Sequence, residues 1–119
     1  MKIIHFIISV ILLVFTSCNK EKFPKPNDLS GNWTEQTDNS FKSKLIFENE
    51  TMYFFKPAST DTLLYRLDDK QELIYLRLKN NSAAGESNHK IFINKRKKEL
   101  TIKGLYIGIN TTETIFKKE

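Results

Sequence analysis

The side chains that could carry out chemistry are few in this chain. It holds one cysteine, Cys18, and two histidines, of which only His89 lies beyond the apolar N-terminal stretch. A lone cysteine offers no disulfide within the chain, and a lone histidine removes most metal sites. We find no serine, carboxylate pair or second histidine at a meaningful spacing from His89. The sequence therefore predicts no catalytic residues, no metal site and no cofactor, and indicates that the protein is not an enzyme.

Cys18 follows the most distinctive stretch of the chain. An apolar run over residues 3–15 begins after Lys2 and ends on the small residues Thr16 and Ser17, which is the layout of a secretory signal. The run is shorter than the roughly 20 residues that a membrane-spanning helix needs. An uncleaved anchor and a plain secretory signal are the alternatives.

A cysteine in this position resembles the lipoprotein box of bacterial signal peptides. The resemblance implies that residues 1–17, a signal peptide helix, are removed and that Cys18 becomes the site of lipid attachment. The protein would then meet the membrane through an N-terminal lipid. The resemblance also implies a location in the bacterial cell envelope: Asn19 in place of a retention aspartate favours the outer membrane, and mixed charges in place of an acidic run favour the side that faces the periplasm. We read residues 18–28, with two prolines and little that is apolar, as a flexible tether.

The charge of the chain gives no sign of a nucleic-acid partner. The net charge is +5, and removal of the leader with its single Lys2 leaves +4, which is too mild for a basic nucleic-acid surface. The densest charge run is Lys95-Arg96-Lys97-Lys98. It could contact lipid headgroups or an acidic partner. More commonly, such a run of charges is a solvated hairpin tip that keeps a sheet soluble.

From residue 29 onward the pattern favours strands over helices. Short runs rich in aromatic and β-branched residues are each closed by a polar cluster, at a spacing of about ten residues, as in a β-meander. Residues 29–119 should form an all-β domain, an antiparallel eight-stranded up-and-down barrel, with an open sheet or β-sandwich as the alternative. The expected strands are 31–38, 41–48, 51–56, 62–68, 71–79, 88–94, 98–104 and 110–117.

Alternation within the strands predicts which side chains face the core. Uncharged residues of the second, fourth, sixth and seventh strands fall on one side and charged residues on the other. The third and fifth strands, with Met52-Tyr53-Phe54-Phe55 and Leu73-Ile74-Tyr75-Leu76, are apolar on both faces. These two strands are therefore either covered outside or exposed as an apolar patch. Gly104 and Gly108 indicate a bend before the last strand.

The first strand carries the signature Gly31-Asn32-Trp33. This Gly-x-Trp pattern, with eight antiparallel strands, resembles the small lipocalin-like lipoproteins of the Bacteroidota. The resemblance implies a close approach of the chain at Gly31 and a Trp33 that plugs the closed end of the barrel. It also implies that a basic residue of the last strand, Lys117 or Lys118, covers Trp33.

Aromatic side chains on the predicted inner faces are candidates for a ligand site. These are Trp33, Phe47, Phe54, Tyr65 and Tyr75, which could line a cup for a small apolar ligand or simply pack as core. Glu35 shares a face with Trp33 and could anchor a polar ligand end with Arg77 as its partner, or lie solvated at the rim.

The sequence therefore favours a lipid-anchored envelope protein that binds a small apolar or amphipathic ligand inside a barrel. The alternative is a protein–protein interaction module, such as an envelope inhibitor or immunity-type lipoprotein, that uses the exposed faces of the third and fifth strands.

Overall fold

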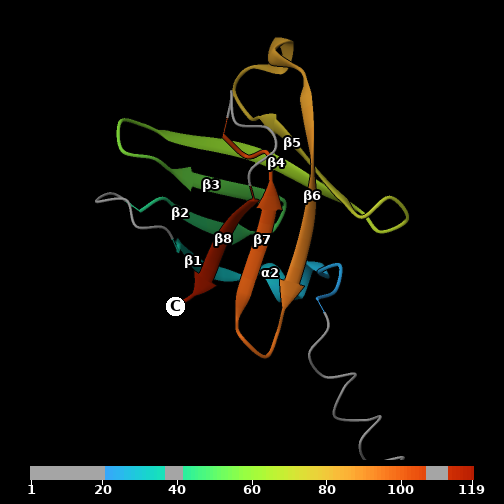
Figure 1. Ribbon diagram of the computed structural model, residues 1–119. Coiled ribbons are helices and arrows are strands. Elements are labelled where there is room, and N and C mark those ends of the chain that lie inside the picture. The colour runs from blue at the N-terminus through green and yellow to red at the C-terminus, as the bar shows by residue number, and fades with distance from the viewer. Residues whose placement is uncertain (1–20, 37–41, 107–112) are drawn as a thin grey trace, which may run out of the picture.

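The computed structural model describes residues 21–36, 42–106 and 113–119. A short helix, α2 (Pro26–Leu29), precedes eight strands, and a 3-10 turn, η1 (Ser82–Ala84), lies between the fifth and the sixth (Figure 1). The strands are β1 (Gly31–Glu35), β2 (Lys44–Glu48), β3 (Thr51–Phe55), β4 (Thr60–Asp68), β5 (Leu73–Leu78), β6 (Glu86–Asn94), β7 (Glu99–Lys103) and β8 (Glu113–Lys118). The leader and Cys18 lie outside the described residues.

The eight strands form a closed barrel in which each strand pairs with its neighbours in the sequence. Every pairing is antiparallel, and β1 pairs with β8 through Trp33 and Lys118 to complete the ring. The predicted antiparallel up-and-down barrel is therefore confirmed. The expected first and last strands ran further than β1 and β8, into residues 37–38 and 110–112 that are not among those described. As expected, the backbone bends at Gly104, whose φ is +68°.

The two ends of the barrel are built differently. The β2–β3, β4–β5 and β6–β7 connections are short turns at one end, each with one non-glycine residue of positive φ: Asn49, Glu72 and Lys98. The other end holds η1, in the connection between β5 and β6, and Leu105 and Tyr106 after β7. We call these the closed end and the mouth.

The N-terminal segment packs against the closed end. Lys22 and Ile93 exchange two backbone hydrogen bonds, of 2.9 and 2.7 Å. Pro24 and Leu29 are fully buried. The sequence predicted a flexible tether over residues 18–28, but its described part is docked on the barrel instead. Composition misled here because prolines suit both an extended linker and a fixed, buried segment that opens a helix.

Trp33 plugs the closed end, as the resemblance implied. It is 1 % exposed, and its indole nitrogen donates a 2.9 Å hydrogen bond to the Leu29 carbonyl. The Nζ of Lys118 lies 5.6 Å from the centre of the indole ring, so Lys118 is the covering residue. A side chain at Gly31 would meet Lys118 at 3.2 Å and would have to adopt a φ of +117°, which explains the glycine.

The barrel interior follows the predicted alternation. Leu45 and Phe47 of β2 are buried, as is Ser43 just before it, and so are Ile91 and Ile93 of β6. The outer faces of β3 and β5 are half-buried, so the expected patch is only partly exposed. Within the described residues the one exposed large hydrophobic side chain is Ile115, on the outside of β8.

Candidate functional site

The mouth of the barrel opens into a hollow of about 580 Å³. Its apolar wall comes from Phe54, Leu63, Leu76 and Leu78 of three consecutive strands, because alternate residues of a strand share one face. The segment after β7 closes another side with Leu105 and Tyr106. Polar side chains also line it: Lys56, Asp61, Glu86, Ser87 and His89.

A buried carboxylate lies beside this hollow. Glu35 is only 3 % exposed, and the Tyr106 hydroxyl donates a hydrogen bond to its Oε1. Ser43 contributes its backbone N–H at 3.4 Å from the same Oε1 and its Oγ at 2.7 Å from the tyrosine oxygen. Because one hydroxyl carries one proton and a carboxylate is the stronger acceptor, Tyr106 donates to Glu35 and accepts from Ser43.

This cluster changes the chemistry of Tyr106. Burial, together with the hydrogen bond to Glu35, raises the pKa of Tyr106 to about 12. The phenol is therefore neutral at any physiological pH and serves as a fixed donor. Its ring lies 5.7 Å from that of Phe54, which ties the polar cluster to the apolar wall of the mouth.

Glu35 does share the inner face with Trp33, but its expected exposure at the rim and its expected partner both need correction. The side chain is buried and hydrogen-bonded rather than solvated at a rim, and its partner is Tyr106 rather than Arg77, which is exposed on the outer face of β5. Tyr106 was missed by sequence reasoning because it follows the bend at Gly104 and belongs to no strand. Leu63 carried a usable signal, since Leu63, Tyr65 and Leu67 fall on the strand face opposite Arg66 and Asp68.

The predicted aromatic residues do not gather in one place. Phe54 lines the mouth, whereas Trp33 plugs the closed end. Phe47 and Tyr65 pack edge to face at 5.3 Å, and the Tyr65 hydroxyl donates to the Asn49 carbonyl in the β2–β3 turn, at 2.8 Å. The predicted inward position of Tyr75 is wrong. Ile74 and Leu76 are the buried residues of β5, so Tyr75 points outward, and a strand that is apolar on both faces gives no alternation to show this.

His89 does have a serine partner, contrary to the sequence analysis. Its Nε2 lies 2.9 Å from Ser87 Oγ, and its Nδ1 lies 2.9 Å from the Lys103 carbonyl oxygen. A carbonyl only accepts, so Nδ1 carries the proton and Nε2 accepts from the serine hydroxyl in the neutral imidazole. The i, i+2 spacing on one strand face was the available signal. The orienting group is a backbone carbonyl rather than the carboxylate of a catalytic triad.

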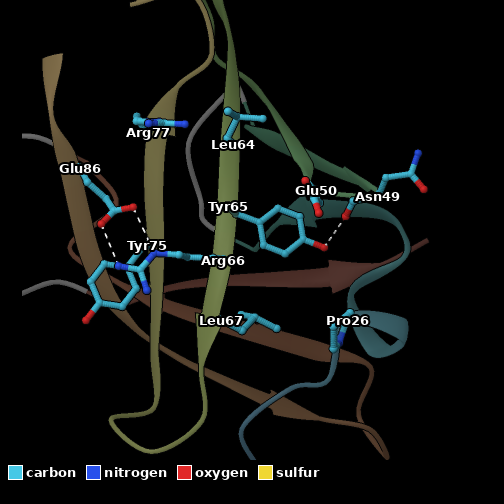
Figure 2. A pocket seen from close by; sticks show the side chains of 10 residues that line it. All are labelled: Pro26, Asn49, Glu50, Leu64, Tyr65, Arg66, Leu67, Tyr75, Arg77 and Glu86. Atoms are coloured by element: carbon cyan, nitrogen blue, oxygen red, sulfur yellow. Dashed lines mark hydrogen bonds and ion pairs between the residues drawn. The ribbon is translucent and has the colours of Figure 1, made fainter. Parts of the chain in front are cut away.

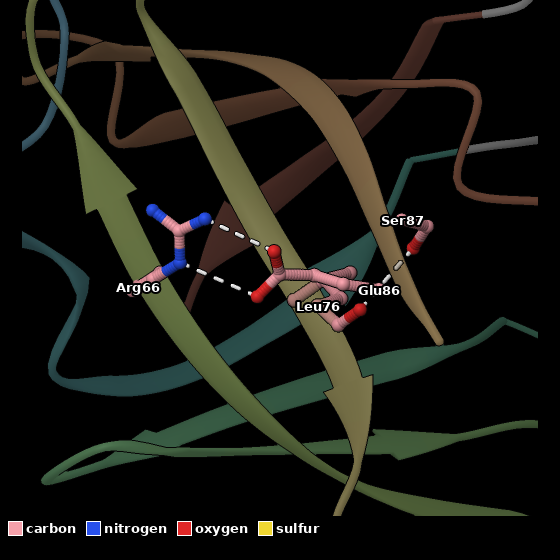
Figure 3. A network of polar contacts seen from close by, with 4 residues as sticks. All are labelled: Arg66, Leu76, Glu86 and Ser87. Atoms are coloured by element: carbon pink, nitrogen blue, oxygen red, sulfur yellow. Dashed lines mark hydrogen bonds and ion pairs between the residues drawn. The ribbon is translucent and has the colours of Figure 1, made fainter. Parts of the chain in front are cut away.

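A second hollow, of about 770 Å³, follows β4 and takes residues from both of its faces (Figure 2). Arg66 is fixed there between two partners: its guanidinium lies 3.8 Å from the centre of the Tyr75 ring and contacts both Glu86 carboxylate oxygens, at 3.0 and 3.3 Å. Figure 3 shows this contact beside Ser87 Oγ, which is 3.5 Å from the Leu76 carbonyl. Tyr65 and Leu67 line the other side of the strand in Figure 2.

Neither hollow contains a metal-binding group of side chains. In residues 21–36, 42–106 and 113–119, no cluster of three histidine, cysteine or acidic residues could hold a metal ion. The helices within those same ranges are all too short or too polar to cross a membrane.

Comparison of the chain with protein-family models, with curated proteins and with solved structures gave no match, so the geometry above is the basis for any functional reading.

Proposed function

We propose that this protein is a lipid-anchored component of the bacterial cell envelope that holds a small apolar or amphipathic ligand in the mouth of its barrel. The observation that carries the proposal is the mouth hollow itself. Its volume of about 580 Å³ falls in the range of roughly 300–1,000 Å³ typical of small-molecule sites, and its wall is apolar with polar groups set at the edge.

The arrangement of these groups indicates the kind of ligand. Phe54, Leu63 and Leu76 offer a hydrocarbon surface for an apolar body. The polar groups are already engaged with one another: Lys56 pairs with Asp61 at 2.7 Å, and Ser87 pairs with His89. A ligand therefore gains most by burying apolar area while its polar end stays near the solvated edge.

The lipid anchor and the envelope location rest on the leader and Cys18, in line with the resemblance to lipocalin-like lipoproteins. The Gly31-x-Trp33 signature supports that resemblance, because Trp33 and Lys118 occupy the places it implies. A lipidated protein with an apolar cup is suited to carry or retain molecules that are poorly soluble in water.

Ligand binding is tested with the full chain, purified from its own envelope. Native mass spectrometry should detect a bound small molecule, and an added fluorescent fatty acid should compete with it. Leu78→Trp, which fills the mouth, should weaken binding of the fluorescent fatty acid at least tenfold. The matched control is Leu64→Trp on the outer side of β4. Equal binding by the two variants would contradict the proposal.

The Ser87–His89 pair allows a separate check that the ligand is bound and not transformed. A serine activated for acyl transfer reacts with a fluorophosphonate, whereas a structural hydroxyl does not. We expect Ser87 to remain unlabelled after long incubation, as judged by peptide mass spectrometry. Stoichiometric labelling that disappears in His89→Ala would overturn the non-enzymatic part of the proposal.

A protein-interaction module is the second candidate, and the hollow along β4 favours it. This hollow is larger than the mouth and presents Tyr75 and two arginines, residue types that dominate binding energy at interfaces. Cross-linking in the envelope should then capture a stoichiometric protein partner that is lost with Tyr75→Ala but kept with Leu78→Trp. The reverse result, or small molecules without a partner, supports the first candidate.

A further inference from the structure

The described chain begins beside the β6–β7 turn at the closed end. Lys22 is held against Ile93 by two backbone hydrogen bonds, and Ile93 lies just before that turn. Cys18, the proposed lipid-attachment site, is four residues upstream of Lys22. Because a chain spans at most about 3.6 Å per residue, Lys22 would lie within roughly 14 Å of a lipid on Cys18. This inference thus rests on the anchor of the proposed function.

Exposed cations concentrate around that point. We call this set the basic end: Lys22, Lys25, Lys95, Arg96, Lys97, Lys98, Lys117 and Lys118. Three contacts hold its parts together. The Lys118 N–H donates to the Lys98 carbonyl at 2.9 Å, the Lys95 ammonium pairs with Asp28 at 3.1 Å, and Asp28 accepts from the Lys25 N–H at 2.9 Å.

The basic end also contains a hollow of about 400 Å³. Trp33 and Ile93 form part of its lining, and Lys95, Lys98 and Lys118 contribute ammonium groups. Asp28 and Glu119 lie there as well, so the hollow is not purely cationic. Three lysines around an apolar base suit a phosphate group that continues into a hydrocarbon chain, as a phospholipid does.

The rest of the described barrel has no comparable excess of positive charge. At the mouth, Lys56 pairs with Asp61 and Lys103 pairs with Glu113 at 3.4 Å. The β4–β5 turn, with Asp68, Asp69 and Glu72, is acidic, and in Figure 1 it projects away from the β6–β7 turn. Positive charge is therefore directed to one side of the closed end.

We propose that the basic end docks on the anionic headgroups of the membrane that carries the Cys18 lipid. The lipid anchor holds the basic end at a distance from the membrane surface that is comparable with the Debye length of about 8–10 Å. At this distance the negative charges of the membrane attract Lys and Arg effectively. Two weak attachments, one lipid and one basic patch, then act together. Docking in this orientation turns the mouth away from the bilayer, so the ligand site faces the aqueous compartment.

The test uses the full chain, purified with its native N-terminus and placed in nanodiscs of phosphatidylcholine alone or with 30 % phosphatidylglycerol. Acetylation of each lysine is followed by mass spectrometry. Lys95 should react several-fold more slowly in the anionic discs, whereas Lys56 and Lys103 at the mouth should react equally in both. Lys97→Glu/Lys98→Glu should abolish the protection. The matched control, Lys42→Glu/Lys79→Glu at the mouth end, changes the net charge by the same amount. It should leave the protection of Lys95 intact.

Each other outcome is decisive. Equal acetylation of Lys95 in both discs, or protection of the mouth lysines instead, overturns the docking. Protection in intact envelope but in neither disc would overturn it in favour of an acidic protein partner. A Cys18 peptide without lipid would overturn the anchor of the proposed function, while the lysine footprint alone would still decide the docking.

Discussion

The two ends of this barrel use the same strands for opposite purposes. At the closed end Leu29 is fully buried and Trp33 is 1 % exposed, and the Trp33 indole is hydrogen-bonded to the segment that covers it. At the mouth Leu78 and Tyr106 are only half-buried and border an open hollow. The comparison indicates that stability is concentrated where the chain enters the barrel, which leaves the mouth free to vary in shape and polarity.

The largest expected effect is at the closed end. Trp33→Ala should lower the free energy of unfolding by about 3–5 kcal/mol, because it opens a cavity and removes the donor to the Leu29 carbonyl. Leu78→Ala at the mouth should cost less than about 2 kcal/mol, since it only enlarges an existing hollow. Urea unfolding followed by circular dichroism measures both. Similar losses in the free energy of unfolding for the two variants would show that stability is not concentrated at the closed end.

The buried cluster next to the mouth gives the next largest effect. Tyr106→Phe should cost about 1–3 kcal/mol, because Glu35 loses a donor while it stays buried. Tyr106→Phe/Glu35→Leu should recover much of that loss, since the buried carboxyl group that lost the Tyr106 donor is then absent. Urea unfolding of the single and double variants decides it. A neutral Tyr106→Phe would mean that the cluster adds nothing to stability.

Alkaline pH tests the same cluster in the unaltered protein. The pKa of Tyr106 is about 12 in the folded state, above the ordinary value of 10. Its contribution to stability is therefore complete below pH 10 and is lost as the pH rises from 10 to 12. Unfolding curves between pH 9 and pH 12 should show this loss. In Tyr106→Phe the free energy of unfolding should fall less steeply over this pH range. An unchanged fall would contradict the raised pKa of Tyr106 as its cause.

The smallest effect concerns the docking of the N-terminal segment. Burial raises the pKa of Asp28, but the hydrogen bond from the Lys25 backbone and the ion pair with Lys95 outweigh it and lower the pKa overall. Its stabilising contribution is thus present above the ordinary value of 3.8 and is lost as the pH falls through the lower folded value. Asp28→Asn should cost up to about 1 kcal/mol at pH 7.

A control for Asp28→Asn comes from another ion pair, between Arg66 and Glu86. Glu86→Gln removes the ion pair with Arg66 on the outer side of the barrel and leaves the contact between Asp28 and Lys95 in place. Limited proteolysis should cut Asp28→Asn faster near residue 22 than either the parent or Glu86→Gln. Equal cleavage of all three would show that Asp28 does not help to hold the segment.

Much of the fold could be predicted from the sequence, because successive side chains of a barrel strand point alternately to the core and to the solvent. The inner faces of β2 and β6 followed directly from the charges opposite them, and Gly31 with Trp33 located the closed end. Alternation gave no answer for Tyr75, since β5 is apolar on both faces. The burial of Ile74 and Leu76, and the register with β4 that sets Tyr75 opposite Arg66, show that it points outward.

The site was less predictable because it depends on contacts between distant residues. Glu35 was correctly placed on the face of Trp33, but its partner Tyr106 lies 71 residues away in a segment without periodicity. The docked N-terminal segment escaped prediction for a related reason. Its attachment runs through the backbone of Lys22 and Ile93, and backbone hydrogen bonds leave no trace in composition.

The pairing of Lys22 with Ile93 also has a mechanical consequence. A pull on the N-terminal chain would load these two backbone hydrogen bonds first and pass the tension into β6, a strand that is itself paired on both sides. Drag on the barrel would thus be carried by the sheet, and the mouth at the opposite end would keep its shape under tension.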